Sequence, residues 1–214
     1  FKKNKNLEFL TKSFPKAHDA NAFGFKFKGG KSIKDDHRRY EVISKLNKKN
    51  LKIMMDLNGY VDINYVKKLS KHINPKKLYW LEEPISINSL ENLKVLKKSV
   101  KFKIAGYELE QTFEGWKNLI LSKTVDIAQP DTIWSGGVTE CLKICNFCNK
   151  NNVSYVPHNF ASIISLAFIL STLSTVIVFS KAAGIKISQF NSNNSFGLSL
   201  NSPSLELFIF LFFL

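Results

Sequence analysis

The sequence has little arginine, although its 214 residues carry a formal net charge of +14. Of its 31 basic residues only two, Arg38 and Arg39, are arginines, and the lysines are scattered along the whole chain. Proteins that bind nucleic acids usually rely on arginine for bidentate contacts to bases and phosphates. The positive charge therefore does not indicate a basic binding surface, and we expect no nucleic-acid partner.

Cysteines are also few, and their number is odd. Cys141, Cys145 and Cys148 all lie in one short segment, which excludes a framework of disulfides and favours a reducing, cytoplasmic location. The chain begins with Phe-Lys-Lys-Asn-Lys and no apolar run follows, so we expect no signal peptide.

Charged side chains are missing from residues 161–180, a stretch of 20 residues that is long enough to span a membrane. Seven of the 20 residues are serine or threonine, and a buried barrel helix would have the same composition. We favour the buried helix and expect no membrane partner. Residues 191–214 follow no regular pattern. We therefore interpret 1–190 as one domain and 191–214 as an apolar tail, such as a truncated or shifted reading frame would produce.

Between residues 23 and 157, short apolar runs alternate with longer segments of helical periodicity. Apolar runs with little alternation are typical of parallel strands that are buried on both faces. The predicted strands are 23–28, 51–57, 78–82, 102–106, 125–129 and 153–157, and the predicted helices are 33–48, 63–72, 90–98, 113–121 and 138–149. We expect Asp62 and Thr139 to be helix N-caps, and no strand is recognisable before Ala22. This alternation predicts an α/β fold, either a doubly wound sheet or most of a (β/α)8 barrel.

Charged residues recur at the ends of the predicted strands, 23 to 27 residues apart. They are Asp56, Glu82, Glu108, Asp131 and His158. In a barrel, such a constant interval brings the side chains together at the carboxyl-terminal mouth, where barrel enzymes have their active sites. In an open sheet they would be strung along one edge. The pattern therefore favours a partial (β/α)8 barrel.

Three of these residues are carboxylates, and they cannot all stay ionised together without a counter-charge. A divalent cation that prefers oxygen ligands, most simply Mg2+, would supply it at Asp56, Glu82 and Glu108. Lys26 and Lys28 lie on one face of the first predicted strand, because strand side chains alternate. The charge of Lys26 can lower the proton affinity of Lys28, which makes Lys28 a candidate base. The alternative for the two lysines is an exposed edge strand in a lysine-rich protein.

His158 and Asp131 each follow a proline at the ends of two successive predicted strands. Neighbouring strands of a barrel would bring the two side chains within hydrogen-bonding distance. The carboxylate would then fix the tautomer of the imidazole and make it a better acid or base.

Seven short segments, in this order and spacing, resemble the enolase superfamily and specifically its mandelate racemase-like branch. The resemblance extends from about residue 23 to 160. The segments are Lys-Phe-Lys (26–28), Met-Asp-Leu-Asn-Gly (55–59), Trp-Leu-Glu-Glu-Pro (80–84), Ala-Gly-Tyr-Glu (105–108), Gln-Pro-Asp (129–131), Gly-Gly-Val-Thr-Glu (136–140) and Pro-His-Asn (157–159).

The resemblance implies a Mg2+-dependent lyase with a barrel fold. Its ligands for Mg2+ would be Asp56, Glu82 and Glu108, and its acid and base would be Lys28 and His158, the latter supported by Asp131. Lys26, Asn58 and Glu83 would be supporting residues near the metal and substrate. In this superfamily a Lys or His base works with Mg2+ that stabilises an ene-diolate. The implied reaction is the loss of water from a sugar acid to give a 2-keto-3-deoxy acid, in an enzyme that we expect to be a homo-oligomer.

The chain differs from the family pattern at three points. The family has an acid near the end of its eighth strand, whereas residues 176–179 contain none, and Tyr107 replaces a common glycine. The amino-terminal α+β capping domain is also missing from the sequence, so we expect a fragment that consists of the barrel domain alone.

Three alternatives remain open at this point. The same residues would serve a racemase or epimerase, in which Lys28 and His158 face opposite sides of one carbon. An incomplete barrel could instead be an inactive remnant with an unpaired sheet edge. Finally, the spacing of Cys141, Cys145 and Cys148 matches the iron–sulfur motif of radical-SAM enzymes. The same spacing also places the three thiols on one helical face, where they would simply pack against the sheet.

Overall fold

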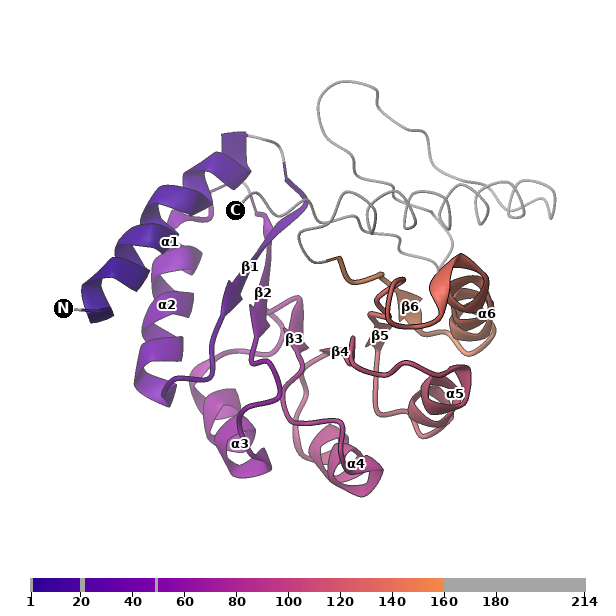
Figure 1. The fold of residues 1–214 in the computed structure, drawn as a ribbon. Coiled ribbons are helices and arrows are strands. Elements are labelled where there is room, and N and C mark those ends of the chain that lie inside the picture. Colours follow the sequence, from indigo (N-terminus) through magenta and orange to yellow (C-terminus); the bar gives the residue numbers. More distant parts are fainter. Residues whose placement is uncertain (1, 20–21, 49, 160–214) are drawn as a thin grey trace. The chain divides into compact units, whose positions relative to one another are not determined.

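The computed structural model describes residues 2–19, 22–48 and 50–159 of the chain (Figure 1). These residues fall into two compact units, one that reaches to Ile104 and one that starts at Ala105. The uncharged stretch 161–180 and the tail 191–214 both lie outside the described residues. Within the described part of the chain, no helix combines the length and the apolar character that crossing a membrane requires.

The first unit contains a helix that the sequence pattern did not reveal, followed by three βα repeats. The helix α1 (Lys2–Asp19) packs against α2 and β1, and its buried Phe14 meets the ring of Phe25 edge-on at 5.1 Å. The other elements are β1 (Gly24–Lys28), α2 (Ile33–Leu46), β2 (Lys52–Asp56), α3 (Ile63–His72), β3 (Trp80–Glu82) and α4 (Leu90–Ser99).

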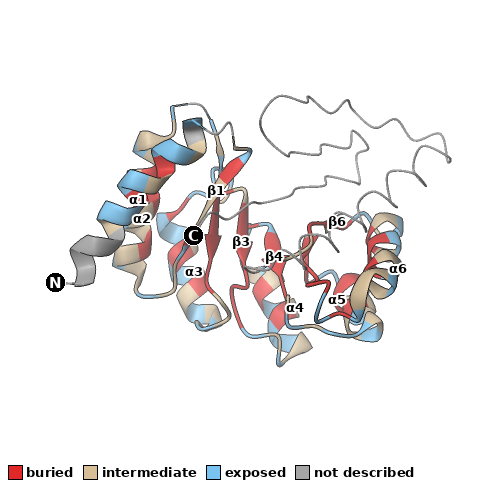
Figure 2. Ribbon diagram, turned by 45° about the horizontal axis from the view of Figure 1, so that its top comes forward, coloured by how far each residue is buried: buried red, intermediate tan, exposed pale blue. Residues whose placement is uncertain are grey.

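The strands of this unit are parallel, and their carboxyl-terminal residues are level with one another. Lys28 of β1 is the register partner of Asp56 on β2, and Asp56 is the partner of Glu82 on β3. β3 is buried throughout, β2 is buried except at Lys52 and β1 is buried in part, whereas each helix is buried on one side and exposed on the other (Figure 2). This is the arrangement expected when helices cover a parallel sheet.

The second unit continues the same alternation of strands and helices. It contains most of β4 (Ile104–Gly106), then α5 (Phe113–Leu121), β5 (Ile127–Ala128), α6 (Gly137–Lys150) and β6 (Ser154–Tyr155). Parallel pairing joins β4 to β5 and β5 to β6. In each unit the strands follow one another in the order of the sequence, and the predicted α/β class is confirmed.

Helix N-caps were predicted correctly at one position and wrongly at another. The Asp62 carboxylate accepts a hydrogen bond from the backbone N–H of Tyr65 and so caps α3 as expected. Thr139, by contrast, lies inside α6, which begins at Gly137 after Gly136 has taken a left-handed conformation (φ +85°). A β-carbon at Gly136 would lie 2.9 Å from the side chain of Glu140, so the glycine is needed for this turn.

The three cysteines lie on α6 with free, buried thiols. Burial raises the pKa of all three thiols, to about 12 for Cys145. A thiol that resists ionisation is a poor ligand for iron, so the packing interpretation of these cysteines agrees with their environment.

Candidate active site

Eight of the nine residues that the sequence singled out lie at or just beyond the carboxyl ends of strands, and the ninth, Lys26, lies in the middle of β1. In the first unit, Lys26 and Lys28 are on β1, Asp56 ends β2 and Glu82 ends β3. In the second unit, Glu108, Asp131 and His158 follow β4, β5 and β6. Parallel strands of one sheet end at the same edge, and this is why each unit gathers its polar side chains there. Asn58 and Glu83 are in the loops that follow β2 and β3.

In the first unit, two carboxylates share two ammonium groups. The Lys26 ammonium lies 3.5 Å from Asp56 Oδ2 and also forms an ion pair with Glu82 Oε1. The Lys28 ammonium donates to Asp56 Oδ2 at 2.6 Å. The two lysines differ in exposure, since the side chain of Lys26 is 9% exposed and that of Lys28 is 63% exposed. Lys26 is therefore the internal counter-ion, whereas Lys28 can reach a molecule in solution.

The pKa values of the two carboxyl groups shift in opposite directions. Burial tends to raise the pKa of Asp56, but the ammonium groups of Lys26 and Lys28 outweigh it and lower this pKa. Burial raises the pKa of Glu82 in spite of Lys26, and the neighbouring Asp56 carboxylate raises it further. Glu82 Oε2 also accepts a hydrogen bond at 3.0 Å from the indole N–H of Trp80, a partner that the sequence pattern did not reveal. Burial thus disfavours the ionised form of Glu82, whereas the two ammonium groups favour the ionised form of Asp56.

Backbone contacts of Asn58 and Glu83 hold the two loops that follow β2 and β3. The N–H of Asn58 donates to Asp56 Oδ1 at 2.9 Å, and Asn58 has a left-handed backbone (φ +51°). Glu83 is also left-handed (φ +39°), and its carbonyl accepts from the N–H of Gly59 at 2.7 Å. These contacts orient Asp56 and join the loop after β2 to the loop after β3.

In the second unit, one imidazole lies between two carboxylates. His158 Nδ1 is 3.0 Å from Asp131 Oδ2, and His158 Nε2 is 2.6 Å from Glu108 Oε2. Asp131 and His158 also form a parallel backbone bridge, so β5 and β6 bring them together as expected. The side chain of His158 is 13% exposed, which leaves the ring an opening to solvent.

Asp131 is held by backbone donors in addition to His158. Its Oδ1 accepts from the N–H groups of Ile133 and Trp134 at 2.9 and 3.4 Å. Burial tends to raise the pKa of Asp131, but the hydrogen bond with His158 and these N–H groups lower it overall. Asp131 is therefore a fixed anion that can orient the imidazole.

Tyr107 is buried and has a left-handed backbone (φ +71°), the conformation that favours the glycine common at this position in the family. A bulky residue rarely adopts this conformation, which indicates local strain directly before Glu108.

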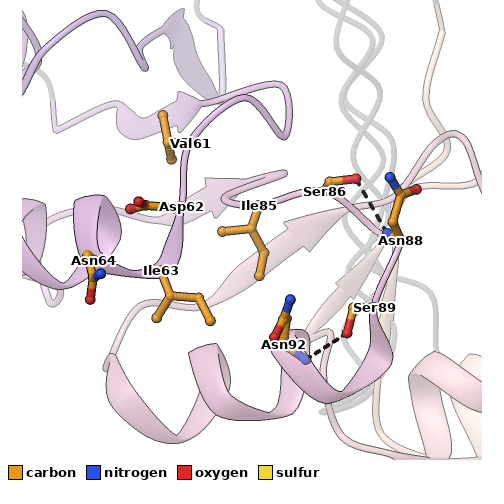
Figure 3. A pocket seen from close by; sticks show the side chains of 9 residues that line it. All are labelled: Val61, Asp62, Ile63, Asn64, Ile85, Ser86, Asn88, Ser89 and Asn92. Atoms are coloured by element: carbon orange, nitrogen blue, oxygen red, sulfur yellow. Dashed lines mark hydrogen bonds between the residues drawn. The ribbon is translucent and has the colours of Figure 1, made fainter.

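A pocket of about 400 Å3 lies on the first unit, between the loops that precede α3 and α4 (Figure 3). Its lining is mainly small and uncharged, and the caps Asp62 and Ser89 form part of its wall. None of the nine predicted site residues lines it.

A divalent cation fits the chemistry of the first cluster. Asp56 and Glu82 offer the oxygen ligands that Mg2+ prefers, and both carboxyl groups are buried at neighbouring strand ends. Glu108 belongs to the second unit. Among residues 2–159, outside the gaps named above, no three His, Cys, Asp or Glu side chains are grouped as a metal site. The shared role of the three carboxylates therefore stays a prediction.

Comparison with known proteins identifies a matching family and relatives that are named dehydratases. A family model described as "Enolase C-terminal domain-like" matches residues 15–190. The chain is 30% identical over 144 residues to an arabinonate dehydratase of Saccharolobus solfataricus, a match that covers 67% of this chain and 39% of the relative. It is 31% identical over 145 residues to an L-galactonate dehydratase of Hypocrea jecorina, which covers 63% and 31% of the two chains.

Solved structures agree with these matches. A 3,6-anhydro-D-galactonate cycloisomerase from Zobellia galactanivorans is similar with a TM-score of 0.72 and 27% identity over 80% of this chain and 48% of that one. A racemase from Streptomyces coelicolor, solved with bound magnesium, has a TM-score of 0.68 and 21% identity over 72% and 46%. The chain thus spans less than half the length of these relatives. Together with the family match, these structures confirm the partial barrel.

Proposed function

Because the chain belongs to the enolase C-terminal domain-like family, we propose that it forms the barrel of an enzyme that removes the proton α to the carboxylate of a sugar acid. The reaction we propose is a dehydration. Two curated relatives are named dehydratases of arabinonate and L-galactonate, both of which are sugar acids. We also infer that the protein acts in the cytoplasm, as a homo-oligomer, on a small-molecule substrate.

One observation carries the proposal, namely the contact of 3.0 Å between His158 Nδ1 and Asp131 Oδ2. Because Asp131 stays ionised, it holds a proton on Nδ1. Nε2 contacts Glu108 Oε2 at 2.6 Å and would be the atom that exchanges a proton with the substrate once Glu108 binds the metal instead. An imidazole that is protonated on both nitrogens can then give the Nε2 proton to a hydroxyl on the β-carbon, which departs as water.

Lys28 would remove the α-proton in the same reaction. Its ammonium first has to lose a proton, and its exposed position on β1 allows that proton to pass to solvent. The electron pair of the broken C–H bond forms a C=C bond, and the C–O bond to the leaving hydroxyl breaks. The resulting enol takes up a proton at the β-carbon, loses the proton of its hydroxyl on the α-carbon and becomes a 2-keto-3-deoxy acid.

Asp56, Glu82 and Glu108 would hold Mg2+, and Lys26 would form ion pairs with the first two. Bound Mg2+ would stabilise the negative charge that develops on the substrate carboxylate. Asn58 and Glu83 would support Asp56 and the loop next to it through their backbone contacts.

Replacing Glu82 by Gln tests the proposed metal site. The variant loses one of three anionic ligands, so its affinity for Mg2+ should fall about tenfold or more, as measured by isothermal titration calorimetry. Glu91→Gln is the matched control, because Glu91 lies on the exposed surface of α4 and should leave the affinity unchanged. Equal affinity in both variants would contradict the ligand assignment.

Replacing Asp131 by Asn tests the proposed acid. Turnover of sugar acids by the full-length protein should fall by roughly three orders of magnitude, because the imidazole loses the partner that fixes its tautomer. Asp126→Asn, in the segment that leads into β5, is the control. Assays with pentonates and hexonates would identify the product. Inversion at the α-carbon without loss of water would mean that the enzyme is a racemase or epimerase and not a dehydratase.

A further inference from the structure

A buried carboxylate next to the proposed base has no role in the reaction described above. Asp36 lies in the first turn of α2 and is fully buried. Its Oδ2 atom accepts two hydrogen bonds, from the backbone N–H of Gly30 at 2.9 Å and from the hydroxyl of Tyr65 at 2.7 Å. Its Oδ1 atom is buried and has no hydrogen-bond partner among the described residues.

The hydrogen bond to Gly30 holds the chain directly after Lys28. The N–H of Gly29 donates to the carbonyl of Asp56 at 2.8 Å, and the guanidinium of Arg39, also on α2, donates to the carbonyl of Lys28 at 2.5 Å. Three successive residues that start at the proposed base are thus anchored, one to β2 and two to α2.

This anchoring matters because β1 is the first strand of the sheet and pairs only with β2 among the described strands. The end of a strand with a single neighbour is prone to fraying. Side chains cannot hold the turn by packing. A β-carbon at Gly29 would lie 2.8 Å from Leu57 Cδ2, and Gly30 has a left-handed backbone (φ +87°) that favours glycine.

The carboxylate is also unfavourable for stability where it lies. Burial raises the pKa of Asp36 in spite of the hydrogen bonds from Gly30 and Tyr65, so its ionised form is less stable in the folded chain than in water. A neutral side chain would fill this space at a lower cost in stability, which favours a role of Asp36 beyond folding.

We propose that Asp36 and Arg39 are positioning residues that hold the end of β1 so that Lys28 points its ammonium at Asp56 and the substrate. Tyr65 of α3 orients the Asp36 carboxylate for this task. The identity of Lys28 as the base rests on the proposed function, whereas the anchoring of its backbone does not.

Amide hydrogen exchange tests the anchoring in the full chain without any assay of activity. In Asp36→Leu the Gly30 N–H loses its acceptor, and its exchange should become at least about tenfold faster. Asp36→Asn keeps an acceptor oxygen of the same shape, so exchange at Gly30 should stay within about twofold of the wild type. Unchanged exchange in the folded Leu variant would overturn the proposal, and so would equally fast exchange in both variants.

The reactivity of Lys28 tests the consequence for the side chain. Loosening of the turn should release the ammonium from Asp56, and acylation of Lys28, followed by peptide mass spectrometry, should become about threefold faster or more. Lys45, an exposed residue of α2, is the internal control and should react at the wild-type rate. Arg39→Met, a change at a partly exposed position, should also make the acylation of Lys28 faster. If Lys45 changes as much as Lys28, the effect is general unfolding of α2 and the proposal is wrong.

Turnover of the full-length protein separates this proposal from the proposed function. Asp36→Leu and Arg39→Met should lower kcat by about tenfold with little change in KM, and Asp36→Asn should restore kcat. If the wild type turns over no sugar acid but the exchange and acylation results hold, the proposed function fails and the anchoring stands. If the wild type is active and kcat is unchanged in both Asp36→Leu and Arg39→Met, the positioning role is wrong.

Discussion

In the first unit two carboxylates share two lysine ammonium groups, whereas in the second unit two carboxylates share one imidazole. The first cluster pairs two carboxyl groups with two amino groups, so its acidic and basic groups are equal in number. The second cluster is balanced only in part, and its charge depends on whether His158 carries one proton or two.

The difference separates two tasks that the proposed reaction combines. The buried part of the first cluster, formed by Lys26, Asp56 and Glu82, suits the binding of a cation and a substrate carboxylate, whereas the exposed Lys28 would exchange a proton with the substrate. A cluster with an imidazole suits proton transfer, since its charge can change by one with each step. The contrast can be tested by removing one charged partner at a time.

The largest effect is expected for Lys26→Met, which breaks the balance of the first cluster. Two buried carboxylates then lose their internal counter-ion, and the free energy of unfolding should fall by about 3–5 kcal/mol. Chemical denaturation at neutral pH would measure it.

Lys28→Met is the matched control, on the same strand and the same face. Its side chain is 63% exposed and its charge is screened by solvent, so the free energy of unfolding should fall by at most about 1 kcal/mol. Equal losses in the two variants would mean that exposure does not distinguish the lysines and that the buried counter-ion is not Lys26.

A smaller effect is expected for Asp131→Asn in the second cluster, where the free energy of unfolding should fall by about 1–2 kcal/mol at neutral pH. The pKa of Asp131 is lowered in the folded chain, where burial is outweighed by the hydrogen bonds from His158 and the backbone. A lowered pKa contributes stability above the unfolded value, near 4, and the contribution is lost as the pH falls through the folded value. The wild type should therefore lose its advantage over the variant in acid, as measured by denaturation between pH 7 and 3. If the difference in stability between wild type and variant persists unchanged at pH 3, it results from packing and not from the charge of Asp131.

The smallest effect, and the only gain, is expected for Asp36→Asn. Because the pKa of Asp36 is raised, the carboxylate costs stability once the pH exceeds the unfolded value near 4. The variant should be more stable than the wild type by about 1 kcal/mol or less at neutral pH. The gain should disappear in acid, where the wild-type carboxyl is protonated in both states. Thermal unfolding at two pH values measures it, and a loss of stability at neutral pH would contradict the expectation.

The βα repeats were predicted closely because their signals are local. Apolar runs marked all six strands, and helical periodicity marked α2 to α6, with α3 and α5 correct to the residue. The strands are shorter than predicted, since hydrogen bonding between neighbours ends before the apolar run does. Helix α1 was missed because Lys2–Asp19 is rich in lysine and contains Pro15, so its apolar face is narrow.

The pairing of site residues was predictable only in part. The regular interval of charged residues predicted that Asp131 would meet His158, and they are 3.0 Å apart. It did not predict that Lys26 would be buried and Lys28 exposed, because alternation places both on one face and says nothing of depth. The contact of Trp80 with Glu82 and the anchoring of Gly30 by Asp36 were also missed, since each joins groups by side-chain orientation rather than by a repeating pattern.

The sequence by itself determined the alternation of strands and helices, the parallel sheet and the level at which the charged residues end their strands, because these follow from periodicity along one chain. Only the tertiary structure decided which lysine becomes the internal counter-ion, which carboxyl is stabilised and which is not, and how the end of β1 is held. These properties depend on burial and on distances between atoms of different strands and helices. Electrostatic energies change steeply with both, so residues of the same type and spacing acquire different roles.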